Sequence, residues 1–322
     1  MKSLHALHRL HVAPRLSVAA LIGLALLAPV ATASAQKEGE PPLRIDVERL
    51  RPNIHVVSGY ENGNVLVIVA DTGVLIVDAQ SSKRVAGLDS AIKRLTPQRV
   101  RTVVNTHYHA DHTEGNGFFH TRGAEIVAQR NIRAQALKDT VIADWNNWHR
   151  EPLPPESLPT KEYDDSFRLT IGSEQVMLYH VVGAHTDGDS FVWLPNANIL
   201  HTGDILEMGA PPFIDLWAGG SLKGMIAGID RAIAISNEKT TIVPGHGRVS
   251  TREDLRRYRA MLADLGTIIS AAVTRGEKVD QVIAARPAKK YSDALGGEIG
   301  EARMVRRLHF GERLARARGE LP

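Results

Sequence analysis

The segment Thr106–His112, with the sequence THYHADH, most constrains what this chain of 322 residues can fold into. It places three imidazoles and one carboxylate directly after residues 100–104, a β-branched run that predicts a strand. Because alternate side chains of an extended backbone point to the same side, His107 and His109 are expected to face a common point. Imidazoles and carboxylates are the ligands that zinc and similar divalent cations prefer. The segment therefore predicts a metal site at the end of this strand.

Three later segments supply further candidate ligands, and each follows residues that predict a strand. His185 follows the dipeptide GA, Asp204 follows TG, and His246 lies between the glycines of PGHG. One isolated pair of histidines would be weak evidence, but several ligands of matching type at strand ends indicate two adjacent metal ions. The candidate metal ligands are His107, His109, Asp111, His112, His185, Asp204 and His246.

The first 35 residues differ in composition from the rest of the chain. Lys2, Arg9 and Arg15 give a basic start without acidic residues, an apolar run spans residues 16–30, and residues 33–35 read ASA. This pattern predicts a secretory signal peptide over residues 1–35, with residues 31–33 as a second cleavage motif. A membrane span fits less well, because the run is short for a bilayer and contains a proline. We expect a periplasmic or secreted protein without stable membrane association after cleavage.

Charge and cysteine content exclude several classes of protein. The chain has 39 Lys and Arg against 36 Asp and Glu, and the three basic residues of the leader account for the whole excess. A mature chain without net charge argues against a nucleic-acid partner. The absence of cysteine excludes both a disulfide framework and a thiolate metal ligand.

The pattern of apolar residues divides the chain into two strand-rich halves, each followed by helices. Strands are predicted at residues 53–58, 64–70, 73–77, 100–104, 125–128, 167–171, 175–181, 190–194, 199–202 and 241–243. Helices are predicted at residues 83–95, 132–137, 221–236, 250–274 and 301–318, with Ser250 and Glu253 as a capping box. The proline-rich stretch 145–161 is expected to be irregular. Two sheets packed face to face with helices outside are the expected architecture.

With these ligands and elements the chain resembles the metallo-β-lactamase superfamily, from Asn53 to about His246 together with the flanking helices. The resemblance implies an α/β fold, a four-layer αββα sandwich of two mixed sheets, in one hydrolase domain over residues 36–322 that includes the C-terminal helices. It assigns a first ion to His107, His109 and His185, a second ion to Asp111, His112 and His246, and a bridging position to Asp204. Asp78 matches the acidic residue that orients a ligating histidine in this family.

The ligand set also narrows the branch of the superfamily. The β-lactamases of the cysteine-ligand subclasses use a thiolate at the second metal, and this chain has none. Asp204 instead resembles the corresponding residue of glyoxalase-II-like and lactonase-like hydrolases, and residues 183–189 resemble an exported branch. β-Lactam hydrolysis therefore lies within the chemistry of such a site, although the ligand set does not favour it.

The function expected from these residues is hydrolysis of a small molecule by an exported enzyme with two zinc ions, for which iron or manganese are alternatives. A hydroxide shared by the ions would attack the carbonyl of an ester, thioester, lactone or cyclic amide. Asp111 would orient this nucleophile and pass a proton to the leaving group. Two alternative functions remain: hydrolysis of a phosphoester or sulfate ester, and metal binding without catalysis.

Several other residues have weaker claims to a role. Structural or surface positions are expected for His55, His120, His149, His180 and His309, and packing is the favoured role of His201. Trp145, Trp148 and His149 are candidates for a pocket wall or for ordinary core. Residues 211–213 and Trp217 are candidates for the pocket border, and Lys223 is expected to be solvated rather than to bind a substrate carboxylate.

Overall fold

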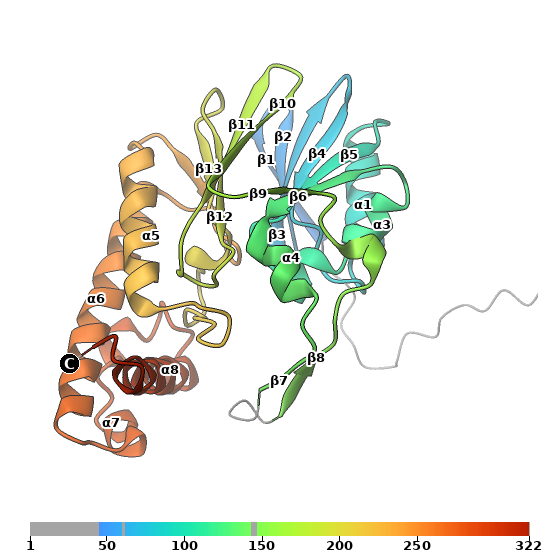
Figure 1. Cartoon of the computed structure of the whole chain (residues 1–322). Coiled ribbons are helices and arrows are strands. Elements are labelled where there is room, and N and C mark those ends of the chain that lie inside the picture. Colours follow the sequence, from blue (N-terminus) through green and yellow to red (C-terminus); the bar gives the residue numbers. More distant parts are fainter. Residues whose placement is uncertain (1–44, 60–61, 143–146, 322) are drawn as a thin grey trace, which may run out of the picture. The chain divides into compact units, whose positions relative to one another are not determined.

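Two β-sheets packed face to face form the centre of the fold in the computed structural model, which describes residues 45–59, 62–142 and 147–321 (Figure 1). Within these residues the first sheet has seven strands in the order β1-β2-β3-β4-β5-β6-β9. Strands β1 to β4 pair antiparallel, whereas β4, β5, β6 and β9 pair in parallel. The strands are β1 Ile45–Arg51, β2 Ile54–Gly59, β3 Asn62–Ala70, β4 Gly73–Val77, β5 Val100–Val104, β6 Glu125–Gln129 and β9 Lys161–Tyr163.

Within the described residues the second sheet has five strands, in the order β10-β11-β12-β13-β14. It is antiparallel except for the last pair, in which β14 runs parallel to β13. Its strands are β10 Ser166–Ile171, β11 Glu174–His180, β12 Ser190–Leu194, β13 Ile199–His201 and β14 Thr241–Val243. A separate antiparallel pair joins β7 Thr140–Ile142 to β8 Trp148–Arg150.

Helices cover the outer face of each sheet. Figure 1 shows α1 and α3 on the side of the first sheet and α5, α6 and α8 on the side of the second. The helices are α1 Val85–Leu95, α2 Ala110–Thr113, α3 Asn116–His120, α4 Arg130–Ala136, α5 Leu222–Ile235, α6 Arg252–Thr274, α7 Val279–Ala284 and α8 Glu298–Ala317. Short 3-10 turns are η2 Pro155–Ser157, η3 Gly203–Ile205 and η4 Lys289–Tyr291. Over the residues that the structure covers, we find no helix with the length and apolarity that a bilayer crossing requires.

Strand β3 shows how the layers are held together. Its alternate residues Val65 and Val67 pack against α1, while Leu66 and Ile68 pack between the two sheets. All four side chains are fully buried, and burial of an aliphatic side chain of this size contributes about 1.5–3 kcal/mol. Both faces of the strand are thus apolar, which explains its nearly continuous hydrophobic sequence.

Parallel strand pairs bring the candidate ligands to one edge of the sandwich. Strands β4 and β5 run in parallel, so Asp78 and Thr106 leave their strands side by side. Strands β13 and β14 are likewise parallel, so Asp204 and His246 follow strand ends at the same edge. The carboxyl ends of parallel strands are where α/β proteins usually place their sites.

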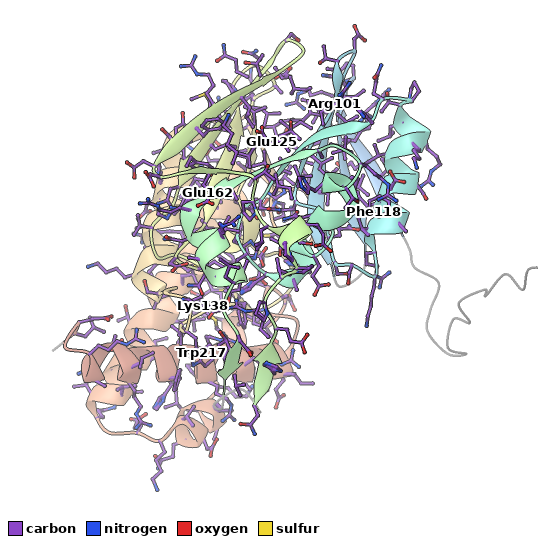
Figure 2. The ribbon with its side chains drawn as sticks, turned by 45° about the vertical axis from the view of Figure 1, so that its right-hand side comes forward. Arg101, Phe118, Glu125, Lys138, Glu162 and Trp217 are labelled. Carbon is purple, nitrogen blue, oxygen red and sulfur yellow. The ribbon has the colours of Figure 1, made fainter. Side chains whose placement is uncertain are left out.

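The sandwich of two mixed sheets with helices outside confirms the expected fold, and several local predictions need correction. The capping box of α6 is formed by Thr251 and Asp254, one residue later than predicted. The stretch 145–161 is not wholly irregular, because it contains β8, η2 and the start of β9, an edge strand. Exposed Arg101, Glu125 and Glu162 come from the neighbouring strands β5, β6 and β9 (Figure 2). The predicted signal peptide lies outside the described residues.

Candidate metal centre

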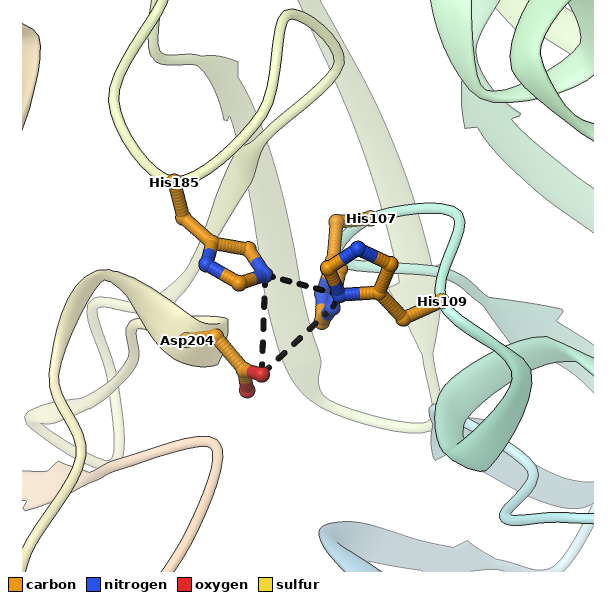
Figure 3. A group of neighbouring side chains, drawn as sticks. All are labelled: His107, His109, His185 and Asp204. Atoms are coloured by element: carbon orange, nitrogen blue, oxygen red, sulfur yellow. Dashed lines mark hydrogen bonds and ion pairs between the residues drawn. The ribbon is translucent and has the colours of Figure 1, made fainter. Parts of the chain in front are cut away.

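Three imidazole nitrogens meet at one point near the end of β5. His109 Nδ1 lies 3.0 Å from His107 Nε2 and 2.9 Å from His185 Nε2. Asp204 Oδ2 lies 3.5 Å from His107 Nε2 and 3.6 Å from His185 Nε2. Figure 3 shows these four side chains pointing toward one another, with His107 and His109 on one segment and His185 and Asp204 on two others. We call His107, His109, His185 and Asp204 the first ligand group.

Asp111, His112 and His246 form a second ligand group beside the first. His246 Nε2 lies 3.1 Å from Asp111 Oδ2 and 3.3 Å from His112 Nε2. Asp204 adjoins this group as well, because its Oδ1 is 3.3 Å from His112 Nε2 and its Oδ2 is 3.4 Å from His246 Nε2. Asp204 therefore lies between the two groups.

The local backbone differs from the sequence prediction although the side chains converge. Residues 106–108 form a bend rather than an extended strand, and Asp111 and His112 lie on the short helix α2. The rings of His107 and His109 nevertheless face each other edge to face, with centroids 4.7 Å apart. His185 comes from the connection between β11 and β12, Asp204 from η3, and His246 from the residues after β14.

The remaining ring nitrogens are held by oxygen atoms of the protein. His185 Nδ1 lies 2.6 Å from the carbonyl oxygen of Phe213, and His112 Nδ1 lies 2.8 Å from Asp78 Oδ2. Since neither oxygen carries a proton, both rings donate there through Nδ1, and the Nε2 atom of each ring faces the ligand groups. Such outer partners fix the tautomer of metal-binding histidines.

Asp78 holds the start of the histidine segment as well as the His112 ring. Its Oδ1 accepts the backbone N–H of Thr106 at 2.8 Å, and its Oδ2 accepts the Thr106 hydroxyl at 2.8 Å. The side chain is fully buried, and its three hydrogen bonds all come from Thr106 and His112. The predicted role of an orienting carboxylate is thus consistent with these contacts.

Asp215 orients the His109 ring as Asp78 orients the His112 ring, and it was not predicted from the sequence. Asp215 Oδ2 lies 3.1 Å from His109 Nε2 and also accepts the hydroxyl of Tyr108. Burial opposes ionisation of Asp215, but the bonds from His109 and Tyr108 hold its pKa far below its ordinary value. The tripeptide Ile214-Asp215-Leu216 carries no recognisable motif, so only the tertiary structure reveals this contact.

The two ligand groups differ in their charge without metal. Burial and neighbouring histidines lower the pKa of His107 well below its ordinary value and the pKa of His185 to about 4, so both rings are neutral. Burial also opposes protonation of His246, but the charge of Asp204 outweighs it and raises the pKa of His246 to about 10. A cation bound at the second group therefore displaces protons.

The residues of both groups fit divalent cations. Asp204 Oδ1 is buried without a hydrogen bond and lies 3.3 Å from His112 Nε2, so a cation bound there would take the place of the His112 proton. Its pKa is nevertheless held well below the ordinary value, because the charges of His112 and His246 outweigh the opposing effect of burial. Glycines leave the space: a Cβ at Gly245 would overlap Asp204 Oδ1, and a Cβ at Gly63 would overlap the His112 ring.

A pocket of about 280 Å³ opens onto both groups. Of the predicted border residues 211–213 only Phe213 lines it. Trp217 stacks on Phe310 and is not among the lining residues. Glu207 and Arg150 also line the pocket and were missed. Burial and the charge of Asp204 raise the pKa of Glu207 to about 8, so this carboxyl is protonated at neutral pH. The lining residues are Tyr108, His109, Ala110, Asp111, Arg150, Asp204, Glu207, Phe213, Asp215 and His246.

The other histidines of the described residues belong to neither ligand group. His201 is buried, accepts the N–H of Gly203 and lies 3.2 Å from the carbonyl oxygen of Asn64, so it packs beneath the turn that carries Asp204. Neither ligand group includes His55, His120, His149, His180 or His309. Lys223 lines a different pocket, and Trp145 lies outside the described residues.

Comparison with known proteins gives the same family as the fold and the ligand set. The sequence profile of the metallo-beta-lactamase superfamily matches residues 58–246. A metallo-beta-lactamase type 2 from Bacillus cereus is 25% identical over 216 residues, which is 65% of this chain and 78% of that protein. The chain belongs to the metallo-beta-lactamase superfamily, and it is a metal-dependent hydrolase.

Solved structures show the same fold. A metallo-beta-lactamase from Pontibacter korlensis superposes with a TM-score of 0.57 at 20% identity and covers 69% of this chain and 100% of that one. A stereoselective inverting sec-alkylsulfatase from a Pseudomonas species superposes with a TM-score of 0.62 at 16% identity. This match covers 83% of the present chain and 50% of the sulfatase.

Proposed function

We propose that this chain is an exported hydrolase with two zinc ions that cleaves a small molecule at a carbonyl group, as in an ester, thioester, lactone or cyclic amide. The observation that carries the proposal is the position of Asp204, within 3.6 Å of imidazole nitrogens of both ligand groups. A carboxylate shared in this way suits two adjacent cations, a common arrangement in hydrolytic enzymes. The neutral charge of the mature sequence favours a small-molecule substrate over a nucleic acid.

Each ligand group would hold one ion, and Asp204 would contact both. Ions bound there supply Lewis-acid activation of a water molecule and of the substrate carbonyl. Asp111 faces the pocket with 32% of its side chain exposed, compared with 6% for Asp204. We therefore assign Asp111 to orient the attacking water and to transfer a proton to the leaving group.

Export is part of the proposal and rests on residues 1–35 alone. Their basic start, apolar run and ASA motif are the features of a cleavable secretory signal. Expression of the full chain in a Gram-negative host, followed by mass measurement of the periplasmic protein, tests this. Cleavage after residue 33 or 35 is expected. Retention of the intact chain in the cytoplasm would contradict export.

Hydrolysis of a sulfate ester is the second candidate. The structural match to the sec-alkylsulfatase covers more of this chain than the match to the Pontibacter korlensis enzyme, 83% against 69%. In-line displacement at sulfur or phosphorus needs the same pair of cations, so the ligand groups suit both reactions. Carbonyl hydrolysis is preferred because the sequence relatives are metallo-beta-lactamases.

A panel of substrates on the zinc-loaded mature protein tests the proposal. It comprises 4-nitrophenyl acetate, γ-nonanoic lactone, nitrocefin, bis-4-nitrophenyl phosphate and 2-octyl sulfate. We expect turnover of a carbonyl substrate that is lost on dialysis against EDTA and restored by zinc. His246→Gln should abolish it, whereas His120→Gln, outside the ligand groups, should not. Turnover of the sulfate alone would establish the second candidate, and activity that survives complete metal removal would contradict both.

A further inference from the structure

Arg150 brings a cationic side chain into the pocket of the metal centre. It ends strand β8, pairs with Thr140 of β7, and lines the pocket together with Asp111 and His246. Of the residues that line this pocket, Arg150 alone is a lysine or arginine. Its position thus combines a permanent charge with direct access to a bound substrate.

The hydrogen-bonding capacity of Arg150 is largely unused. Its Nε and Nη1 are buried without a hydrogen-bond partner, and Nη2 has only a long contact of 3.4 Å to the Thr140 hydroxyl. Buried donors of a guanidinium are nearly always paired, because desolvation without a partner is unfavourable. The unpaired donors therefore point to an acceptor that binds from outside.

The neighbouring ring and acids leave the guanidinium available. Arg150 lies over the ring of Tyr108 with its Cζ 4.3 Å from the centroid, a cation–π contact that uses none of its hydrogen-bond donors. The nearby carboxylate of Asp215 is occupied by Tyr108, His109 and the backbone N–H of Trp217 and Ala218. Glu207 accepts the N–H of Phe213. Across the described part of the chain, no carboxylate forms an ion pair with Arg150.

We propose that Arg150 recognises a carboxylate on the substrate, separate from the bond that is cleaved. A planar carboxylate can accept two parallel hydrogen bonds from one edge of a guanidinium, and at the edge formed by Nη1 and Nη2 it would give Nη1 the partner it lacks. This inference rests on the proposed hydrolysis and narrows its substrates to anionic molecules. Arg150 acts as a specificity residue and takes no part in the cleavage.

Two esters with the same leaving group test the proposal. Mono-4-nitrophenyl glutarate carries a free carboxylate, and 4-nitrophenyl butyrate is its neutral counterpart. Wild type should prefer the glutarate. Arg150→Met should lower kcat/KM for the glutarate about 10- to 100-fold more than kcat/KM for the butyrate, the loss expected for a hydrogen bond to a charged group. Arg150→Lys keeps the positive charge but has no planar pair of donors, so its kcat/KM for the glutarate should lie between those of wild type and Arg150→Met.

Arg122→Met is the matched control. Arg122 also lies over an aromatic ring, with its Cζ 3.6 Å from the centroid of Phe118, but it does not line the pocket. This variant should preserve the preference for the glutarate. Equal loss on both esters in Arg150→Met would overturn the proposal, because it would indicate that Arg150 supports only the Tyr108 ring.

Calorimetric binding of glutaranilic acid and of its neutral methyl ester separates this inference from the proposed function. Zinc-loaded wild type should bind the acid more tightly, and Arg150→Met should remove the difference. If wild type cleaves neither ester in the kinetic assay, ester hydrolysis fails, and the calorimetric difference still decides the role of Arg150. Equal affinity of wild type for the acid and its methyl ester would overturn the inference.

Discussion

Replacing Asp78 with asparagine tests whether outer contacts set the metal affinity of the second ligand group. Asp78 accepts three hydrogen bonds of 2.8 Å, two from Thr106 and one from His112. Its φ is 68°, a conformation that asparagine also tolerates, so the backbone need not change. The substitution therefore removes the charge and one acceptor while the shape is conserved.

The expected size of the effect follows from the two orientations of the new amide. With its NH2 group toward the Thr106 N–H, one buried donor loses its acceptor, which costs about 1–3 kcal/mol of folding free energy. With the NH2 group toward His112, the ring can become the acceptor, and its proton then moves to Nε2, the nitrogen that faces His246. Either outcome weakens the second group, and loss of an outer partner typically lowers metal affinity about 10- to 100-fold.

Competition with a chromophoric chelator, starting from metal-free protein, measures this effect. Asp78→Asn should weaken one of the two zinc sites about 10- to 100-fold and leave the other unchanged, because no residue of the first group contacts Asp78. Glu301→Gln is the control, since Glu301 is equally buried but pairs with Arg286 far from the ligands. It should lower stability without changing zinc affinity. Two wild-type affinities in Asp78→Asn would refute the reasoning.

Three further substitutions test other parts of the account. Asp215→Asn should weaken zinc binding at the first group about 10-fold, because His109 loses its orienting carboxylate; the same titration measures it. Gly245→Ala should abolish zinc binding at the site by displacing Asp204. Gly209→Ala is the control: its methyl meets no atom within 4 Å, and its only cost is the left-handed φ of 84°, so it should lose stability but retain zinc; elemental analysis compares the two variants. Although burial opposes its ionisation, the bond from Arg248 holds the pKa of Asp254 below the ordinary range. Its contribution to the cap of α6, about 1 kcal/mol, is fully present above pH about 4 and decreases as pH falls further. Urea unfolding of wild type and Asp254→Asn should therefore differ most at pH 7, and the difference should shrink steadily below pH about 4.

The ligands were predictable from sequence because their chemistry is local. Imidazoles and carboxylates placed just after strands converge whenever those strands lie at one edge of a sandwich, so His185, Asp204 and His246 could be proposed from their positions alone. The exact backbone was less accessible. His107 and His109 converge through a bend, and the capping box of α6 is shifted by one residue.

The residues that sequence reasoning missed act through long-range contacts. Asp215 meets His109 across 106 positions of the chain, and Arg150 reaches the pocket from a strand pair inside a proline-rich stretch. Neither residue lies in a recognisable sequence motif, and single aspartates and arginines are common in loops and strands. Only the packing of the sandwich shows which of them face the ligands.

The number of zinc ions bound per folded chain tests the central claim most directly. Zinc-loaded protein, freed of excess metal by gel filtration and analysed for zinc and protein, should contain two ions per chain. His246→Gln, which alters the second ligand group only, should contain one. A wild-type chain that retains one ion or none under the same conditions would contradict the account.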